Sequence, residues 1–255
     1  METNAIKAII TGGASGLGLS TAQKFCELGG HVTLVDLNAE ALALAKASLD
    51  TDGEPVHVIT ADVTDEQARA EAMAKAHEVM SGLNVLVNCA GILGAGRVLG
   101  RDGPMSLERF RQTIEVNLIG SFNSAKSAAE LMQHNTGDEK GVIINTASVA
   151  AYEGQIGQAA YAASKGGVVG MTLPMARELA RFGIRVMTIA PGVFHTPMVD
   201  GMTPEIQAAL AAGIPFPKRL GRPEEYAKLA AHIVENEYFN GSVLRLDGAV
   251  RLEPK

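Results

Sequence analysis

The chain alternates short β-branched runs with longer alanine-rich stretches, and this alternation limits the fold more than any other feature. Seven runs have strand character, at residues 6–10, 31–35, 56–60, 84–87, 142–145, 184–189 and 242–246. Helical patterns occupy residues 16–28, 39–49, 65–81, 107–134, 158–181 and 223–235. The strand runs are apolar without strict alternation, which is typical of strands covered on both faces. We therefore expect an α/β protein with a doubly wound, seven-stranded parallel sheet and helices on both faces.

Composition and charge narrow the class of protein. Hydrophobic residues make up 47% of the 255 residues and charged residues 20%, which is ordinary for a globular protein. Because no composition break, repeat or low-complexity tract divides the chain, residues 1–255 are predicted to form a single domain. The formal net charge is −6 and no basic run occurs. A nucleic-acid partner is therefore not expected, since phosphate neutralisation needs a basic face.

Cysteine usage and hydropathy bear on the compartment. Cys26 and Cys89 are far apart and have no CxxC or Cys/His spacing, so neither a disulfide framework nor a metal site is expected. No apolar stretch is long enough to span a bilayer. The segment METNAIKAIITGG enters a strand within five residues, which leaves no room for a targeting peptide. We expect a cytoplasmic protein with no membrane partner.

The first strand runs directly into TGGASGLG, residues 11–18, which opens the next helix. Glycine allows a sharp turn and close approach of a ligand, and the helix N-terminus offers amide donors to a pyrophosphate. No GK[ST] follows, so a P-loop is not indicated. The residues predicted to bind a dinucleotide here are Gly12, Ser15, Gly16, Leu17 and Gly18.

An acidic residue ends the second strand. The carboxylate of Asp36 can accept hydrogen bonds from ribose hydroxyls and would repel a 2′-phosphate. Its neighbours Leu37 and Gly13 bring no cation that would attract that phosphate, so NAD is favoured over NADP. The alternative is that Asp36 only caps the following helix.

Two further strand ends fit the same ligand. Asp62 and Val63 end the third strand, where the carboxylate can meet the adenine amino group. The alternative is a loop carboxylate beside Thr64, which forms a capping-box pattern with Gln67 and predicts the start of the third helix. The fourth strand ends in Asn88, Cys89, Ala90 and Gly91, small residues that suit a backbone lying against a cofactor or a simple tight turn.

Two long loops are predicted to bind substrate, at residues 92–106 and 191–217, the second with a short helix at 204–211. Both follow the carboxyl ends of strands, where open α/β sheets bind ligands.

A phenol and an ammonium are spaced for proton transfer. Tyr161 and Lys165 stand four residues apart in a helical pattern, so both side chains project from one face. A nearby ammonium is expected to lower the pKa of the phenol, which can then take a proton from an alcohol. Ser148 follows the adjacent strand and can hydrogen-bond the substrate oxygen. The alternative for Tyr161 and Lys165 is an ordinary exposed i, i+4 pair on a helix surface. Tyr152 has no lysine partner, and we assign it to packing or to the pocket entrance.

Over nearly its full length the chain resembles the short-chain dehydrogenase/reductases, through TGGASGLG, NCAG, EVNLIG, Ser148, YAASK and PGVFHTP. The resemblance implies a Rossmann domain with a catalytic set of Asn117, Ser148, Tyr161 and Lys165. Asn117 would hold a helix kink and a relay water, and Lys165 would also bind the nicotinamide ribose. The cofactor-binding set then also includes Tyr161, Lys165, Pro191, Gly192, Val193 and Thr196.

Longer segments are similar to one branch of that family, the type-2 3-hydroxyacyl-CoA dehydrogenases. They are GVIINTASVAAYEGQIGQAAYAASKGG, GMTLPMARELARFGIRVMTIAPG, PFPKRLG and NGSVLRLDGAVR. This likeness implies NAD-dependent oxidation of short or 2-methyl-branched L-3-hydroxyacyl-CoA, in fatty acid metabolism or branched-chain amino acid degradation. It implies substrate contacts by Ser148, Gln155, Gln158 and Tyr161, and a homotetramer.

One segment departs from that branch. LGAGRVLGRDGPMSL, at residues 93–107, replaces a lysine-bearing loop, so Arg97 and Arg101 are left as contacts for CoA phosphates or as solvated loop charges. Two other functions stay open. One is a hydroxysteroid or broad secondary-alcohol dehydrogenase, or carbonyl reductase, and the other is a scaffold protein that binds NAD without catalysis.

Overall fold

The sheet is parallel throughout. The computed structural model describes residues 1–2, 5–50, 56–101 and 103–254, so Asp102 of the predicted 92–106 loop and Lys255 lie outside the described residues. Within the described ranges one sheet has seven strands in the order β3-β2-β1-β4-β7-β8-β9. They are β1 (Lys7–Thr11), β2 (His31–Asp36), β3 (His57–Thr60), β4 (Val85–Asn88), β7 (Gly141–Thr146), β8 (Ile184–Pro191) and β9 (Val243–Leu246). The predicted single α/β domain with this sheet is confirmed.

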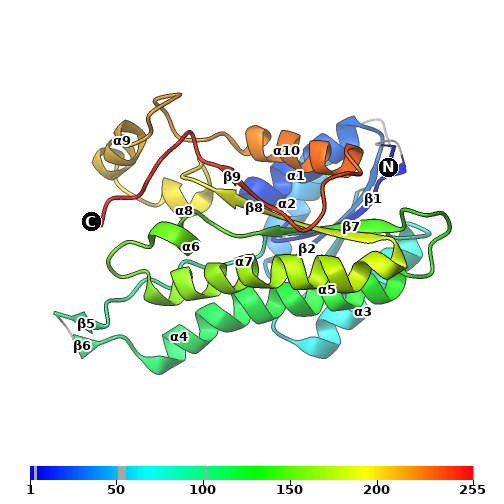
Figure 1. Ribbon diagram of the computed structural model, residues 1–255, viewed down its shortest axis with the longest axis horizontal. Helices are drawn as coiled ribbons and strands as arrows, with labels where there is room; N and C mark the ends of the chain where they lie inside the picture. The colour runs from blue at the N-terminus through cyan, green and yellow to red at the C-terminus, as the bar shows by residue number, and fades with distance from the viewer. Residues whose placement is uncertain (3–4, 51–55, 102, 255) are drawn as a thin grey trace.

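Helices cover both faces of the sheet (Figure 1). One layer holds α1 (Gly16–Glu27), α2 (Ala39–Leu49) and α10 (Pro223–Glu235). The other holds α3 (Glu66–Val79), α4 (Leu107–Ile114), α5 (Gly120–Met132) and α7 (Ala159–Leu179). The strand order reverses direction between β1 and β4, and an open α/β sheet binds its ligand outside the strand ends at such a point.

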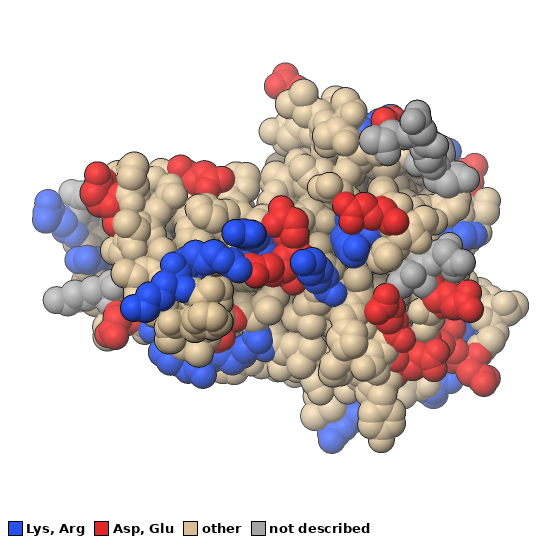
Figure 2. Space-filling view, turned by 90° about the horizontal axis from the view of Figure 1, so that it is seen from above, with Lys and Arg blue, Asp and Glu red and all other residues tan. Residues whose placement is uncertain are grey.

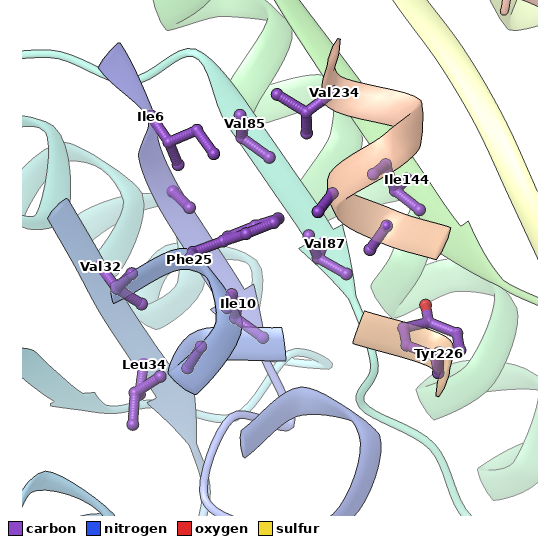
Figure 3. Packing of buried hydrophobic residues seen from close by; sticks show 14 of the residues in the cluster. Ile6, Ile10, Phe25, Val32, Leu34, Val85, Val87, Ile144, Tyr226 and Val234 are labelled. Atoms are coloured by element: carbon purple, nitrogen blue, oxygen red, sulfur yellow. The ribbon is translucent and has the colours of Figure 1, made fainter. Parts of the chain in front are cut away.

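Neighbouring residues of one strand enter different cores. Ile10 is fully buried against α1 and α10, whereas Ile9 is buried in the cluster that includes α3 and α5. Figure 3 shows Phe25 of α1 and Tyr226 of α10 lying over β1, β4 and β7. Full burial of one such phenylalanine contributes roughly 2–3 kcal/mol. Coverage of both faces explains why the strand runs are apolar without alternation.

The helix predicted over residues 107–134 is interrupted. A π-helical turn, η2 (Glu115–Ile119), separates α4 from α5, and Asn117 is buried within it. The Asn117 amide nitrogen donates to the Ile92 carbonyl at 2.9 Å and to Ser164 Oγ at 3.0 Å, and its oxygen accepts from the Ile92 amide at 2.8 Å. These hydrogen bonds to a neighbouring loop and helix stabilise an inward-facing side chain where the extra residue widens the turn.

Several local details differ from the expectations. The capping box of Thr64 and Gln67 is wrong, because Asp65 caps α3 by accepting from the Ala68 amide at 2.9 Å. Thr64 instead donates its hydroxyl to Asp62 at 2.7 Å. The predicted loops contain unforeseen elements: the hairpin β5 (Leu99–Gly100) and β6 (Gly103–Pro104), and α8 (Pro197–Asp200) before the expected short helix, α9 (Pro204–Ala212). A further short helix, α6 (Ala150–Glu153), follows β7, and the 3-10 turn η3 (Ala180–Phe182) extends α7.

One face of the molecule is mixed in charge. Figure 2 shows acidic and basic side chains close together on the face seen from above. In the described part of the chain, no helix combines the length and the apolar character that crossing a membrane requires.

Candidate active site

A cavity of about 890 Å³ opens at the carboxyl edge of the sheet. It is lined by strand ends, by the glycine turn and by the loop after β8. Twenty of the predicted site residues line it together: Gly12, Ser15, Gly16, Leu17, Gly18, Asp36, Asp62, Val63, Cys89, Ala90, Gly91, Ser148, Gln155, Gln158, Tyr161, Lys165, Pro191, Gly192, Val193 and Thr196. Residues from sequence positions 12 to 196 thus share one space.

The glycine turn lies tightly against the end of β4. Gly12 has φ +64°, and a Cβ there would lie 2.6 Å from the Ala90 amide nitrogen. A Cβ on Gly18 would lie 2.3 Å from the Gly12 carbonyl oxygen. Only glycine fits at these two positions. The residues at the start of α1, Ser15, Gly16 and Leu17, line the cavity. An open helix N-terminus of this kind suits a pyrophosphate.

Asp36 is fixed beside that turn. One carboxylate oxygen accepts from the Ala14 amide at 3.2 Å and the other from the Asn38 amide at 3.1 Å. Among the described residues that line the cavity, the lysines and arginines are Arg111 and Lys165. Neither of these two residues is on β2 or on the turn that follows it. Among the described residues that line the cavity, Asp36 therefore has no lysine or arginine beside it in the sequence.

Asp62 lies in the same half of the cavity, at the end of β3. Its Oδ1 accepts from the Thr64 amide at 2.8 Å and from the Thr64 hydroxyl at 2.7 Å. The carboxylate therefore holds its own turn as well as facing the cavity.

Ser148, Tyr161 and Lys165 come together in the other half. Ser148 follows β7 and is 8% exposed, and its Oγ accepts from the Ala150 amide at 3.1 Å. Lys165 is 4% exposed and donates its ammonium to the Thr146 carbonyl at 2.8 Å. Its Nζ lies 5.8 Å from the centre of the Tyr161 ring. The exposed i, i+4 pair considered for these two residues does not describe this arrangement.

Burial dominates the acid–base properties of the pair. Loss of solvent lowers the pKa of Lys165 to about 8, because the charged form is the one that water stabilises. Burial raises the pKa of the Tyr161 phenol, and a hydrogen bond with Ser148 opposes the rise. The predicted lowering of the Tyr161 pKa by Lys165 is therefore wrong for the protein alone. The ammonium is directed at Thr146, and desolvation of the phenol is the larger effect.

Two predicted asparagines lie behind the cavity wall. Asn88 donates to the Ser121 carbonyl at 3.1 Å and to Asn145 at 2.9 Å, and its oxygen accepts from Thr11. Asn117 holds Ile92 from the π-helical turn. Asn117 is also close to the lysine, because a Cβ on Gly91 would lie 3.2 Å from its oxygen and 3.5 Å from Lys165 Nζ. Neither asparagine lines the cavity, and each holds neighbouring backbone or side chains in position by hydrogen bonds.

Other candidates lie outside the cavity. Arg97 and Arg101 are exposed on and beside the β5–β6 hairpin, and neither is a lining residue. Tyr152 is 49% exposed, and the Arg245 guanidinium lies 5.2 Å from its ring centre. Tyr152 therefore packs against Arg245 and does not form the pocket entrance.

Sequence reasoning missed two parts of the lining. One face of α4 and η2 contributes Glu108, Arg111, Gln112, Glu115 and Val116. Their three- and four-residue spacing could have identified them as one helix face. Leu252, near the C-terminus, also lines the cavity, and no pattern in its neighbourhood indicated this.

The donor set suits an organic dinucleotide. Two glycines that tolerate no side chain, an open helix start and a fixed acid match a pyrophosphate and a ribose. In the part of the chain that is described, no group of three or more His, Cys, Asp or Glu side chains is arranged to hold a metal ion.

Comparisons with known proteins agree with this geometry. A family model described as short chain dehydrogenase matches residues 7–207. The 3-hydroxyacyl-CoA dehydrogenase type-2 of Bos taurus is 50% identical over 253 residues, which cover 97% of this chain and 95% of the relative. A crystal structure of 3-hydroxyacyl-CoA dehydrogenase type-2 from Mycobacterium avium has a TM-score of 0.90 and 41% identity, covering 97% of this chain and 96% of that one. The structure of levodione reductase has a TM-score of 0.87 and 31% identity, covering 97% and 98%.

The family match spans most of the sheet and the residues of the cavity, and the relatives align along nearly their whole length. The resemblance inferred from the motifs is confirmed. The chain belongs to the short-chain dehydrogenase family and is an oxidoreductase that uses a nicotinamide dinucleotide.

Proposed function

We propose that this enzyme oxidises L-3-hydroxyacyl-CoA to 3-oxoacyl-CoA, reversibly and with NAD, and that it acts on short or 2-methyl-branched acyl chains. The observation that carries the proposal is that Ser148, Tyr161 and Lys165 line the same cavity as the glycine turn and Asp36. The substrate class is supported by the name of the 50% identical relative. Such a substrate belongs to fatty acid metabolism or branched-chain amino acid degradation.

The site residues have complementary roles in this proposal. Ser148 binds the substrate oxygen and holds the carbinol beside Tyr161. Tyr161 accepts the hydroxyl proton as the general base and donates it in the reverse direction. Bound NAD supplies the hydride acceptor. Lys165, anchored on the Thr146 carbonyl at 2.8 Å, would bind the nicotinamide ribose and place its ammonium beside the Tyr161 ring. Asn117 fixes the loop beside Lys165 through Ile92.

NAD is proposed over NADP because of the acid at the end of β2. The Asp36 carboxylate accepts two backbone amides, which hold it where ribose hydroxyls would bind. A 2′-phosphate placed there would be repelled by the carboxylate, and the exposed neighbour Leu37 offers it no charge.

The CoA phosphates are assigned to the segment at residues 92–106. The exposed side chains of Arg97 and Arg101 would contact these phosphates. The segment that leads into the hairpin is held near the cavity, since the Gly96 amide, next to Arg97, donates to the Gly157 carbonyl at 2.8 Å, and Gly157 precedes the lining residue Gln158. Gln155 and Gln158 line the cavity and would border the acyl thioester.

A hydroxysteroid or broad secondary-alcohol dehydrogenase is the second candidate. Met198 and Met202 line the cavity, and methionine adapts to differently shaped apolar ligands. The likeness to levodione reductase favours the same candidate. The family membership favours either enzyme over a scaffold that only binds NAD.

We also propose a cytoplasmic homotetramer that acts without nucleic-acid or membrane partners. Phe122 of α5 and Leu173 of α7 are 46% and 44% exposed, and such side chains suit a subunit interface. Both cysteines are free thiols, as in a reducing compartment. Elution as a monomer in gel filtration, or fractionation with an organelle, would contradict these assignments.

The role of Tyr161 is tested by Tyr161→Phe, with Tyr152→Phe as the matched control. Removal of the phenol oxygen should lower kcat for NADH production by about a hundredfold to ten-thousandfold, the usual contribution of a general base. Affinity for NAD, measured by fluorescence titration, should change little. Tyr152→Phe should keep full activity, because that ring packs outside the cavity. Equal turnover by the two variants would refute the mechanism.

A further inference from the structure

The C-terminal segment Val250–Pro254 crosses the substrate half of the active site. After β9 the chain turns back over the carboxyl edge, and Figure 1 shows this red segment ending beside α6 and α8. The Ile156 amide donates to the Pro254 carbonyl at 3.0 Å, and the Gln155 side chain donates to the Glu253 carbonyl at 3.0 Å. The segment therefore lies against the loop between α6 and α7 that leads to Tyr161.

A network of ion pairs holds the C-terminal segment against α6 and β9. Arg245 of β9 pairs with Glu153 of α6 at 2.8 Å and with Asp247 at 2.7 Å. Arg251 pairs with the same two acids, each at 3.3 Å, and the Leu252 amide donates to Glu153 at 3.4 Å. Because Glu153 is only five residues beyond Ser148, the segment is anchored next to the catalytic strand end.

Leu252 is the residue of this segment that lines the cavity. It packs in one apolar cluster with Val199, Met202 and Leu210, which also line the cavity from the α8–α9 region. These four side chains form what we call the end wall. In the sheet order, β7, β8 and β9 lie on the side opposite Asp36 and Asp62, so the end wall bounds the substrate half.

We propose that Leu252 determines which acyl chains fit, because its side chain closes the end wall against the apolar group beyond the reacting carbon. This inference rests on the proposed function, since it assigns the acyl chain to that half of the cavity. Shortening the side chain at 252 lengthens the space, and enlarging it shortens the space.

The test compares Leu252→Ala and Leu252→Phe with the wild-type enzyme. For each, kcat/KM is measured with NAD for 3-hydroxybutyryl-CoA and 3-hydroxyoctanoyl-CoA, and for 2-butanol and 2-octanol. Leu252→Ala should raise the long-to-short ratio of kcat/KM by roughly tenfold, and Leu252→Phe should lower it by a similar factor. The KM for NAD should stay constant in both variants, because Leu252 is remote from the glycine turn.

Glu253→Ala is the matched control, because its side chain is exposed and the segment uses only its carbonyl. Its ratio should equal that of the wild type. Ratios that change by less than about twofold in both Leu252 variants, or in the same direction, would overturn the inference. If the wild-type enzyme oxidises the alcohols and neither thioester, the proposed acyl-CoA function fails. The alcohol pair still decides the role of Leu252 in that case.

Discussion

Lys165 is an ionisable side chain that is buried in the folded protein. The residue is 4% exposed, its ammonium donates to the Thr146 carbonyl, and burial lowers its pKa to about 8. The usual value is 10.5. The spacing of Tyr161 and Lys165 could be inferred from the sequence, but the balance of their pKa values could not. That balance depends on desolvation, which only the packed structure fixes.

The lowered pKa of Lys165 predicts a pH-dependent stability. Since the folded-state pKa is below the unfolded value, the unfolded chain binds more protons between about pH 8 and pH 10.5. The free energy of unfolding should rise with pH in this window. Relative to Lys165→Met, the wild-type enzyme should gain about 2 to 3 kcal/mol between roughly pH 7 and pH 10, because constant contributions cancel in the difference.

Urea unfolding of both proteins across this pH range measures the effect. Lys75→Met serves as the control, because the Lys75 side chain is 59% exposed. The difference between that variant and the wild type should not follow the same window. A flat difference for Lys165→Met would show that the lysine is not destabilised by burial.

At the level of elements, the glycine turn between β1 and α1 leaves no room for a side chain at Gly12. We predict that Gly12→Ala lowers the free energy of unfolding by about 1–3 kcal/mol, because the new Cβ meets the Ala90 backbone. Gly201→Ala after α8 should instead change it by less than about 1 kcal/mol, since φ there is −73° and the nearest atom to the new Cβ, the Pro197 carbonyl oxygen, lies 3.9 Å away. Equal urea midpoints for the two variants would contradict the tight packing of the turn.

The sequence predicted elements well where both faces of a segment are buried. The seven strands of the described sheet lie within two residues of their predicted ends, because apolar β-branched runs and flanking turns mark them. The β5–β6 hairpin and α6 were missed, since they are short and depend on tertiary contacts. The interruption at Asn117 could not be derived from local propensity, because its hydrogen bonds reach Ile92 and Ser164, far along the chain.

At the scale of the whole molecule, one cavity extends over the point where the strand order reverses. Asp36 and Asp62 lie above β2 and β3, and Ser148 and the C-terminal segment lie toward β7 and β9. The order of the sequence motifs predicted Asp36, Asp62 and Ser148, and it predicted that they lie at the same edge of the sheet. The position of Leu252 in the cavity lining could not be predicted, because it depends on the C-terminal segment returning across that edge of the sheet. No local sequence pattern indicates such a return.

The function proposed for this site is the oxidation of 3-hydroxyacyl-CoA with NAD. The most direct measurement is kcat/KM of the wild-type enzyme for L-3-hydroxybutyryl-CoA, its 2-methyl-branched analogue and a hydroxysteroid, each with NAD and with NADP. We predict that a thioester gives the highest value and that NAD exceeds NADP by at least about tenfold, as expected for a carboxylate facing the ribose. A higher value for the steroid, or equal kcat/KM with NADP, would contradict the proposed function.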